Sequence, residues 1–255
     1  MDSGPRFARS EWRRKMILTL DSISKRFGAI VIANGVDLAV GDGEALGILG
    51  PNGAGKTTLF GIIAGTISPD SGRVIFQGED ITHLPPDKRC RKGIARAFQV
   101  PQPFGGMTVF ENLVVAAAFG QDKSERDVCA TSVEIIERCG LASKINRLAG
   151  TLTLLDRKRL ELARALATEP KLLLLDEVAG GLTEQECHAL VALISDIRTS
   201  GLTIVWIEHV VHALTAVVDR VVVLHGGAFI AQGDPQSVIR SPQVAEIYMG
   251  IPVDV

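Results

Sequence analysis

The chain has 255 residues and a formal net charge of −2, with 46% hydrophobic and 22% charged residues, which is typical of a soluble globular protein. That length suits one large domain, or a core with an inserted subdomain. The near-neutral charge argues against a nucleic-acid binder, no apolar run approaches the ~20 residues that span a bilayer, and the four cysteines lack metal or disulfide spacing.

Residues 1–16 are expected to form a disordered basic tail. This stretch holds Arg6, Arg9, Arg13, Arg14 and Lys15 and lacks the apolar segment of a secretion signal. Contact with anionic lipid is the alternative interpretation of these charges.

The first ordered elements are predicted to be two antiparallel strands, Ile17–Leu20 and Ile30–Val40, separated by a turn region over Lys25–Gly28. Phe27 in that region is a candidate for stacking on a nucleotide base, with packing in a small sheet as the equally weighted alternative. Arg73–Gln77 adds a further short strand.

A phosphate-binding loop follows the apolar, strand-length run Ala45–Leu49. The pattern is a glycine, four free positions and then Gly-Lys-Thr, before an apolar stretch that suits a helix. Successive backbone N–H groups and a helix N-terminus would form a seat for polyphosphate. Lys56 would reach the outer phosphates, and the Thr57 hydroxyl would bind Mg²⁺. The predicted loop consists of Gly50, Pro51, Asn52, Gly53, Ala54, Gly55, Lys56, Thr57 and Thr58.

A helical block is expected between two halves of an α/β core. Ile94–Phe98 reads as a buried strand that ends at Gln99, and a Pro- and Gly-rich loop follows. Apolar periodicity then predicts three helices, near Thr108–Phe119, Glu125–Cys139 and Asp156–Thr168. We therefore assign 99–170 to a helical subdomain.

Strands and helices alternate again from residue 171. The predicted strands are Leu172–Leu175, Thr203–Ile207, Arg220–Leu224 and Ala228–Ala231, and the predicted helices are Glu184–Arg198 and His209–Val217. This alternation predicts a mostly parallel sheet, with ligands at the strand carboxyl ends. The fold class is α/β: a phosphate-loop ATPase core (17–98 and 171–232) with an antiparallel N-terminal β subdomain, the inserted helical subdomain and a C-terminal segment (233–255).

Two acids, Asp176 and Glu177, directly follow the run of four leucines that starts at Leu172. Burial of that run as a central strand would leave both carboxylates beside the phosphate loop. Asp176 is then the candidate Mg²⁺ ligand, and Glu177 the candidate base for an attacking water. Gln99 and His209 follow other predicted strands, where an amide would sense the metal and its water, and an imidazole would bond the γ-phosphate.

In order and spacing these motifs resemble the ATP-binding subunits of ABC transporters, over about residues 17–250. The resemblance implies ATP and Mg²⁺ as ligands, with Phe27 as the adenine-stacking aromatic. It implies that Lys56, Glu177 and His209 act in catalysis, and that Thr57, Asp176 and Gln99 contact the metal. It also gives Gln99 and the helical subdomain the contact with the membrane subunits.

Finer features resemble the branched-chain amino acid importer branch, among them Arg96-Ala-Phe-Gln99, Glu208-His209-Val and the tail Ile247-Tyr-Met-Gly250. Relatives there carry branched-chain amino acids, urea or short amides. The implied partners are transmembrane permease subunits, a second ATP-binding subunit and, indirectly, an external solute-binding protein, with no nucleic acid. The implied location is peripheral, on the cytoplasmic face of the inner membrane.

The family's Leu-Ser-Gly-Gly-Gln signature is replaced here by Leu152-Thr153-Leu154-Leu155-Asp156. In the family this segment closes over ATP held by the other subunit, so Thr153 is a candidate nucleotide contact. Leucine does not allow positive φ or close backbone approach cheaply, and Asp156 would add negative charge near a polyphosphate. We expect an asymmetric pair with a paralogous partner, in which the site completed by this segment hydrolyses ATP slowly or not at all.

Two other interpretations of the chain stay open. One is an ATP-binding regulatory or catalytically degenerate ABC subunit, which the altered segment Leu152–Asp156 favours. The other is a soluble ABC ATPase that acts on ribosomes or DNA. Such proteins usually carry two cassettes or a long coiled-coil insertion, neither of which is found in this chain.

Overall fold

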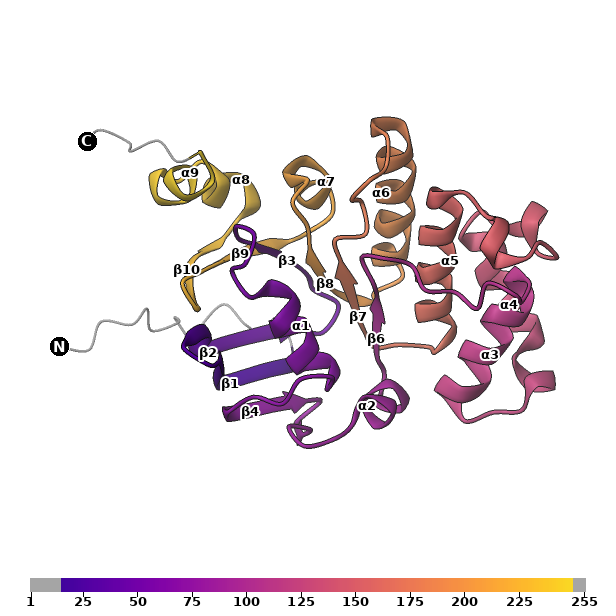
Figure 1. The fold of residues 1–255 in the computed structure, drawn as a ribbon, viewed down its shortest axis with the longest axis horizontal. Helices are drawn as coiled ribbons and strands as arrows, with labels where there is room; N and C mark the ends of the chain where they lie inside the picture. The colour runs from indigo at the N-terminus through magenta and orange to yellow at the C-terminus, as the bar shows by residue number, and fades with distance from the viewer. Residues whose placement is uncertain (1–14, 250–255) are drawn as a thin grey trace.

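The computed structural model describes residues 15–249. Its centre is a six-stranded sheet in the order β10-β9-β3-β8-β7-β6 (Figure 1). The five strands from β9 to β6 are parallel to their neighbours, and β10 pairs antiparallel with β9. These strands are β3 (Ala45–Leu49), β6 (Ile94–Ala97), β7 (Leu172–Asp176), β8 (Thr203–Ile207), β9 (Arg220–His225) and β10 (Ala228–Gly233).

A second sheet is antiparallel and has the order β2-β1-β4-β5. Its strands are β1 (Met16–Phe27), β2 (Ile30–Gly41), β4 (Ser71–Phe76) and β5 (Glu79–Asp80). The predicted antiparallel pair is confirmed, but the turn predicted over Lys25–Gly28 is too long, because β1 continues to Phe27. The predicted tail 1–16 also extends too far: Met16 begins β1 and the Lys15 carbonyl accepts from Asp42 N, while residues 1–14 lie outside the described chain.

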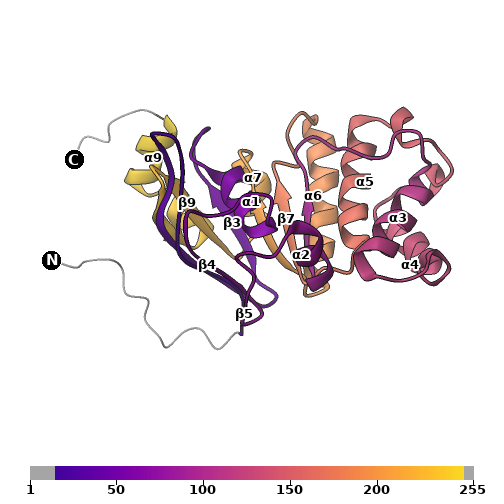
Figure 2. The ribbon, with the colours of Figure 1, turned by 60° about the horizontal axis from the view of Figure 1, so that its bottom comes forward.

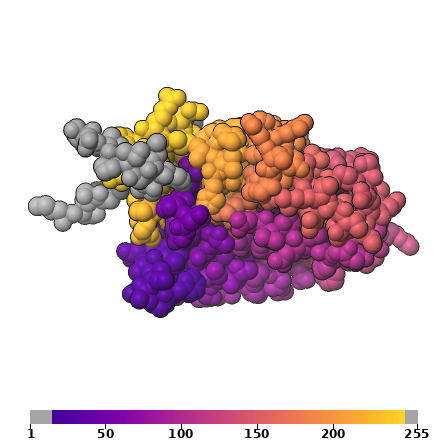
Figure 3. Space-filling view, turned by 45° about the horizontal axis from the view of Figure 1, so that its top comes forward, coloured from indigo at the N-terminus to yellow at the C-terminus, as the bar shows by residue number. Residues whose placement is uncertain are grey.

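Helices α3 (Val109–Gln121), α4 (Glu125–Arg138) and α5 (Leu154–Ala167) lie at the end of the molecule opposite the small sheet, whereas α9 (Pro242–Met249) lies at the same end as that sheet (Figures 1 and 2). The space-filling view shows the resulting elongated shape, with the indigo N-terminal sheet at one end and the helical part at the other (Figure 3). The helices are α1 (Lys56–Ala64), α2 (Pro86–Lys92), α3 (Val109–Gln121), α4 (Glu125–Arg138), α5 (Leu154–Ala167), α6 (Glu184–Thr199), α7 (Val211–Thr215), α8 (Pro235–Ile239) and α9 (Pro242–Met249), with short 3-10 turns at Ala142–Lys144 and Ala149–Thr151.

The central strands are buried on both faces, which explains their unbroken apolar sequences. Leu173 and Leu175 of β7 pack into the core on the side of the helical part, whereas Leu172 and Leu174 face the core shared with α1 and the antiparallel sheet. Because side chains alternate along a strand, the run of leucines serves two hydrophobic cores at once.

Two predicted boundaries changed for reasons that bear on the site. The helix predicted over Asp156–Thr168 begins earlier, at Leu154, with Thr153 as its N-cap. The helix predicted over His209–Val217 is only Val211–Thr215: Val210 has a non-helical backbone with φ −80° and ψ 86°, and the N–H groups of His209 and Val210 donate to the Glu208 carboxylate.

No helix within residues 15–249 is both long enough and apolar enough to cross a membrane. All four cysteines are free thiols, as the sequence predicted.

Candidate functional site

The loop between β3 and α1 is shaped by glycines. Gly55 is the N-cap of α1 with φ 97°, and Gly53 has φ 80°, backbone conformations that favour glycine. A Cβ on Gly50 would meet the Leu224 carbonyl oxygen at 2.3 Å, and one on Gly55 would meet the Ile32 side chain at 2.5 Å. A side chain at Gly50 or Gly55 would therefore force the loop away from its neighbours.

The N-terminus of α1 has no side-chain cap. By contrast, threonine hydroxyls cap α3, α5 and α6. The first N–H groups of a helix have no intrahelical acceptor, and together with the helix dipole they attract anions. The uncapped start of α1 is therefore suited to a phosphate group.

Lys56 is 4% exposed and its Nζ donates to the carbonyl oxygens of Gly50 at 2.7 Å and Pro51 at 3.1 Å. Burial lowers the pKa of this ammonium group, while the charges of Glu177 and Asp176 act in the opposite direction. The lysine thus lies inside the loop with two carboxylates near it.

Asp176 ends β7, beside the phosphate loop as the sequence predicted. Its Oδ1 lies 3.5 Å from the Thr57 hydroxyl oxygen, and its Oδ2 forms an ion pair with Arg96 of β6. The Asp176 side chain is 3% exposed. A buried carboxylate beside a hydroxyl and a guanidinium therefore lies at the carboxyl end of the sheet.

Glu177 is contacted by the two polar residues that the sequence placed at neighbouring strand ends. Gln99 Nε2 donates to its Oε2 at 2.6 Å, and His209 Nε2 lies 2.6 Å from its Oε1. Glu177 has φ 47°, a left-handed conformation that costs a residue with a Cβ about 1–2 kcal/mol, and its N–H is held by the Ile207 carbonyl at 2.9 Å. The strained backbone thus aims Glu177 between Gln99 and His209.

Oxygen ligands for a hard divalent cation are present in Thr57 and Asp176. No group of three or more His, Cys, Asp or Glu side chains suited to a metal occurs in the described part of the chain. Mg²⁺ is usually held by one or two carboxylates together with phosphates and waters rather than by a cage of protein ligands. The donor set therefore fits Mg²⁺ bound together with a polyphosphate.

Phe27 is half-exposed at the end of the β1–β2 hairpin, with the Lys25 ammonium 5.3 Å from its ring centroid. Ile32 of the same hairpin borders Gly55. The hairpin end therefore lies beside the phosphate loop, which leaves Phe27 accessible to a base.

Asp156 does not project toward a nucleotide site, contrary to the sequence-based argument about its charge. Its side chain is 4% exposed, and its carboxylate bonds Lys144 Nζ at 2.5 Å and the Thr153 hydroxyl at 2.8 Å. Burial raises the pKa of Asp156, but the hydrogen bonds from Lys144 and Thr153 together with the nearby positive charges outweigh this effect. The pKa of Asp156 is therefore lowered. The carboxylate is therefore an internal anion that fixes the start of α5.

Positive φ plays no part in this segment, contrary to the expectation from its missing glycines. Leu154 and Leu155 are the first residues of α5, and neither has positive φ. The difference is the size of the leucine side chain: Leu154 is 37% exposed, and its Cδ2 lies 3.5 Å from the position that a Cβ on Gly181, in the loop after Glu177, would occupy. The Thr153 hydroxyl already donates to Asp156, so this part of the segment offers an apolar side chain and a hydroxyl with an internal partner.

Three charged residues were not assigned roles from the sequence: Arg96, Glu208 and Lys158. Arg96 pairs with Asp176 and its guanidinium carbon lies 4.7 Å from the Phe98 ring centroid. Glu208 and Lys158 are 1% and 4% exposed. The arginine within the four-residue strand Ile94–Ala97 could have been noticed in the sequence. The burial of Glu208 and Lys158 could not, because it depends on the packed structure.

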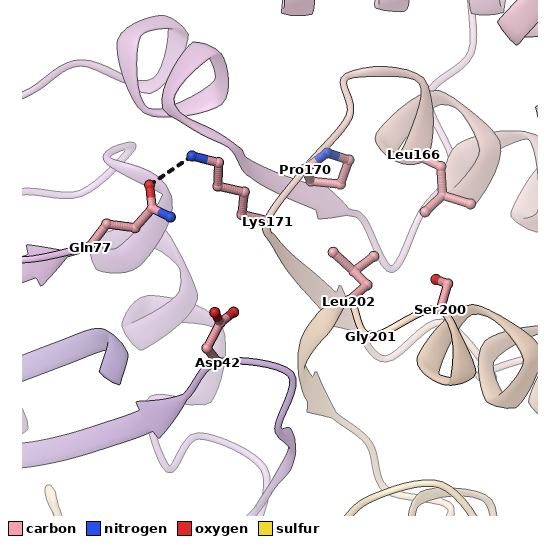
Figure 4. Close-up of a pocket in the computed structure, with 8 residues that line it drawn as sticks. All are labelled: Asp42, Gln77, Leu166, Pro170, Lys171, Ser200, Gly201 and Leu202. Carbon is pink, nitrogen blue, oxygen red and sulfur yellow. Dashed lines mark hydrogen bonds between the residues drawn. The ribbon is translucent and has the colours of Figure 1, made fainter. Parts of the chain in front are cut away.

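A cleft of about 500 Å³ lies elsewhere on the molecule (Figure 4). It is lined by residues such as Asp42, Lys171 and Ser200, and a hydrogen bond of 2.9 Å joins Lys171 Nζ to Gln77 Oε1. Lys171 and Leu202 precede β7 and β8, so this cleft is at the amino ends of the strands. It shares no residue with the phosphate-loop site.

Comparison with known proteins gives a consistent match. A family model described as "ABC transporter" matches residues 33–180. The chain is 37% identical over 251 residues to the high-affinity branched-chain amino acid transport ATP-binding protein BraF of Pseudomonas aeruginosa, covering 92% of this chain and 98% of BraF. It is 34% identical over 252 residues to LivG of Escherichia coli, which bears the same description, covering 92% and 98%.

Two further similarities bear on function. The lipopolysaccharide export system ATP-binding protein LptB of Haemophilus influenzae is 34% identical over 234 residues, covering 92% of this chain and 97% of LptB. A solved ATP-binding cassette of an ABC transporter in its ADP conformation has a TM-score of 0.84 at 32% identity, and the match covers 93% of this chain and all of that one.

Proposed function

This chain belongs to the ABC transporter family as an ATP-binding subunit with ATPase activity, and from that premise we propose that it drives an importer for branched-chain amino acids or related small polar solutes such as urea and short amides. The observation that carries the ATPase part is the convergence of Gln99 and His209 on Glu177, beside the loop that holds Lys56. The names of the relatives support the importer part.

ATP would bind with its phosphates on the N–H groups at the start of α1 and its base against Phe27. Lys56 would exchange its bonds to the Gly50 and Pro51 carbonyls for the outer phosphates. Charge-assisted hydrogen bonds of this type contribute about 1.5–3 kcal/mol each. Lys56 therefore places positive charge where negative charge develops during hydrolysis.

Glu177 is the proposed general base. Each carboxylate oxygen has two lone pairs, so bonds from Gln99 and His209 leave acceptor capacity for the proton of an attacking water. His209 would then contact the γ-phosphate. Thr57 and Asp176, with Gln99 at the edge, would hold Mg²⁺, which supplies charge neutralisation between the phosphates when it is bound.

The proposed partners are transmembrane permease subunits, contacted through Gln99 and the helical part of the chain. The proposed location is peripheral, on the cytoplasmic face of the inner membrane. A second ATP-binding subunit would complete the site from outside, because Thr153 contacts Asp156 of its own helix rather than this chain's phosphate loop. An external solute-binding protein would deliver the cargo.

The proposed complex is an asymmetric pair of ATP-binding subunits, because of the side chains at Thr153 and Leu154. The exposed Leu154 and the internally bonded Thr153 hydroxyl replace the donors that the family's signature offers to the γ-phosphate. The charge of Asp156 does not contribute to this asymmetry, since Lys144 neutralises it. A paralogous partner with an intact signature would then complete this chain's own ATP site.

Transport assays test the proposal directly. The chain is co-expressed with candidate permease subunits, and ATP-dependent uptake of labelled leucine, urea and acetamide is measured in right-side-out vesicles or in proteoliposomes that enclose ATP. Glu177→Gln serves as the matched inactive control. ATP-dependent uptake of one of these solutes is expected. Co-purification with lipopolysaccharide, and ATP-stimulated release of lipopolysaccharide without solute uptake, would instead assign the chain to the export function of LptB.

A further inference from the structure

Two buried charges have no part in the mechanism proposed above. Lys158 on α5 and Glu208 after β8 are 4% and 1% exposed. A buried charge costs several kcal/mol unless hydrogen bonds and an opposite charge compensate it. The contacts of these two side chains therefore indicate what their burial provides.

The Glu208 carboxylate accepts hydrogen bonds from backbone N–H groups in two loops of the site. Its Oε1 accepts from Ala179 N at 2.8 Å, in the loop directly after Glu177. Its Oε2 accepts from His209 N at 2.9 Å and Val210 N at 3.4 Å. One carboxylate thus joins the loops that follow β7 and β8.

Lys158 joins the loop after β6 to the same centre. Its Nζ donates to the Gln99 carbonyl oxygen at 3.3 Å. Burial lowers the pKa of Lys158, and the negative charge of Glu208 opposes that shift. The buried ammonium group therefore holds the backbone of the loop after β6 at Gln99.

Two further residues of α5 also contact the loop after β6. Arg164 Nη1 donates to the Gln102 carbonyl at 2.9 Å, and Glu161 Oε2 lies 3.4 Å from Gln102 N. Lys158, Glu161 and Arg164 are three residues apart, so they lie along one side of the helix. A displacement of α5 against the core would therefore carry the loop of Gln99 with it.

We propose that Lys158 and Glu208 are two buried positioning residues: Lys158 holds the backbone of Gln99, and Glu208 holds the backbone of Ala179 and His209, so that the Gln99 and His209 side chains meet at Glu177. Lys158 also links the loop of Gln99 to α5, the helix that begins at the altered signature segment. This inference rests on the proposed role of Glu177 as the base.

The test uses the full chain and three variants. Lys158→Met removes the charge but keeps the length of the side chain, and Lys158→Arg keeps the charge. Glu208→Gln replaces one of two acceptor oxygens by an NH₂ donor, which leaves a backbone N–H facing a donor. We expect Lys158→Met and Glu208→Gln to lower kcat for ATP at least tenfold with KM within about threefold, and Lys158→Arg to retain most of kcat.

Hydrogen exchange provides a second measurement that does not depend on hydrolysis. Amide exchange in peptides that contain Ala179 and His209 should rise at least tenfold in Glu208→Gln, and exchange in the peptide that contains Gln99 should rise at least tenfold in Lys158→Met. The matched control is Lys123→Met, which removes an exposed pair with Glu169 in the same part of the chain. It should change neither kcat nor exchange at these amides.

Unchanged exchange at Ala179 and His209 in Glu208→Gln, or at Gln99 in Lys158→Met, would overturn the proposal. A wild-type activity in Glu177→Gln would remove the base but not the two positioning residues, because the exchange measurement tests them without hydrolysis.

Discussion

The Asp156 carboxylate lies 2.5 Å from the Lys144 ammonium group, with its side chain 4% exposed. The residue that stands where the family has a neutral amide is therefore turned into the protein and paired with a cation. Its Oδ2 also accepts from the Thr153 hydroxyl, and the Thr153 hydroxyl in turn caps α5. The altered segment is therefore a structured helix start.

The pair between Asp156 and Lys144 should give a pH-dependent part of the stability. The pKa of Asp156 in the folded chain is lowered from 3.8, so its contribution is fully present above the unfolded pKa and is lost as pH falls through the folded pKa. The difference in unfolding free energy between wild type and Asp156→Asn should be constant from about pH 7 to 5 and shrink below about pH 4. Urea unfolding at each pH measures it, with the exposed Glu134→Gln as control. A difference that stays constant down to about pH 3 would contradict the assignment.

Restoring glycine in the altered segment should raise hydrolysis in the assembled complex. Because Asp156 faces inward, the useful change is Leu154→Gly with Leu155→Gly, while Asp156→Gln alone should only loosen the start of α5. We expect ATP turnover to roughly double as the second site becomes active. Each glycine costs the helix about 1 kcal/mol, so thermal stability is measured in parallel. Unchanged turnover in a stable complex would count against an asymmetric pair.

Replacing the proposed base should separate binding from chemistry. Glu177→Gln keeps the shape of the side chain but removes the basic oxygen, and it retains only one of the two acceptor oxygens that face Gln99 and His209. We expect ATP affinity to stay within about threefold and kcat to fall by roughly 10²–10⁴. Equilibrium binding of a fluorescent ATP analogue and steady-state phosphate release provide the two numbers. Hydrolysis at the wild-type rate in the full complex would exclude Glu177 as the base.

Arg89 should be a major stabilising residue of the nucleotide core. It is 1% exposed and donates to the carbonyl oxygens of Ile62 and Ile63 at the end of α1 (2.6 and 2.9 Å), and of Thr82 and Leu84 (2.8 and 2.9 Å). Arg89→Met leaves these acceptors without their donor, so we expect a loss of about 3–5 kcal/mol in urea unfolding.

Arg89→Lys is the control for Arg89→Met, because it retains the charge without the planar fork of donors. It should fall between wild type and Arg89→Met. A loss below about 1 kcal/mol in Arg89→Met would show that water replaces the arginine.

The mostly parallel direction of the core strands and the position of the phosphate loop could be predicted because their sequence signals are local. A run such as Leu172–Asp176 has no polar residue to expose until its end, so it must be a buried strand with its acid at the carboxyl end. The glycine spacing at Gly50–Gly55 likewise specifies a turn that few other residues allow. The ends of helices were less predictable: His209 and Val210 lie before α7, and their N–H groups donate to the Glu208 carboxylate.

The sequence by itself determined the fold class, the phosphate loop and which polar residues follow the strands. Backbone conformation and the alternation of buried and exposed positions are encoded within a few neighbouring residues. The tertiary structure decided which way each charge faces. It turned Asp156 inward to Lys144, paired Arg96 with Asp176 and brought Glu208 to the backbone around Glu177. The partner of a buried charge comes from an element distant in sequence, so only the packed chain determines it.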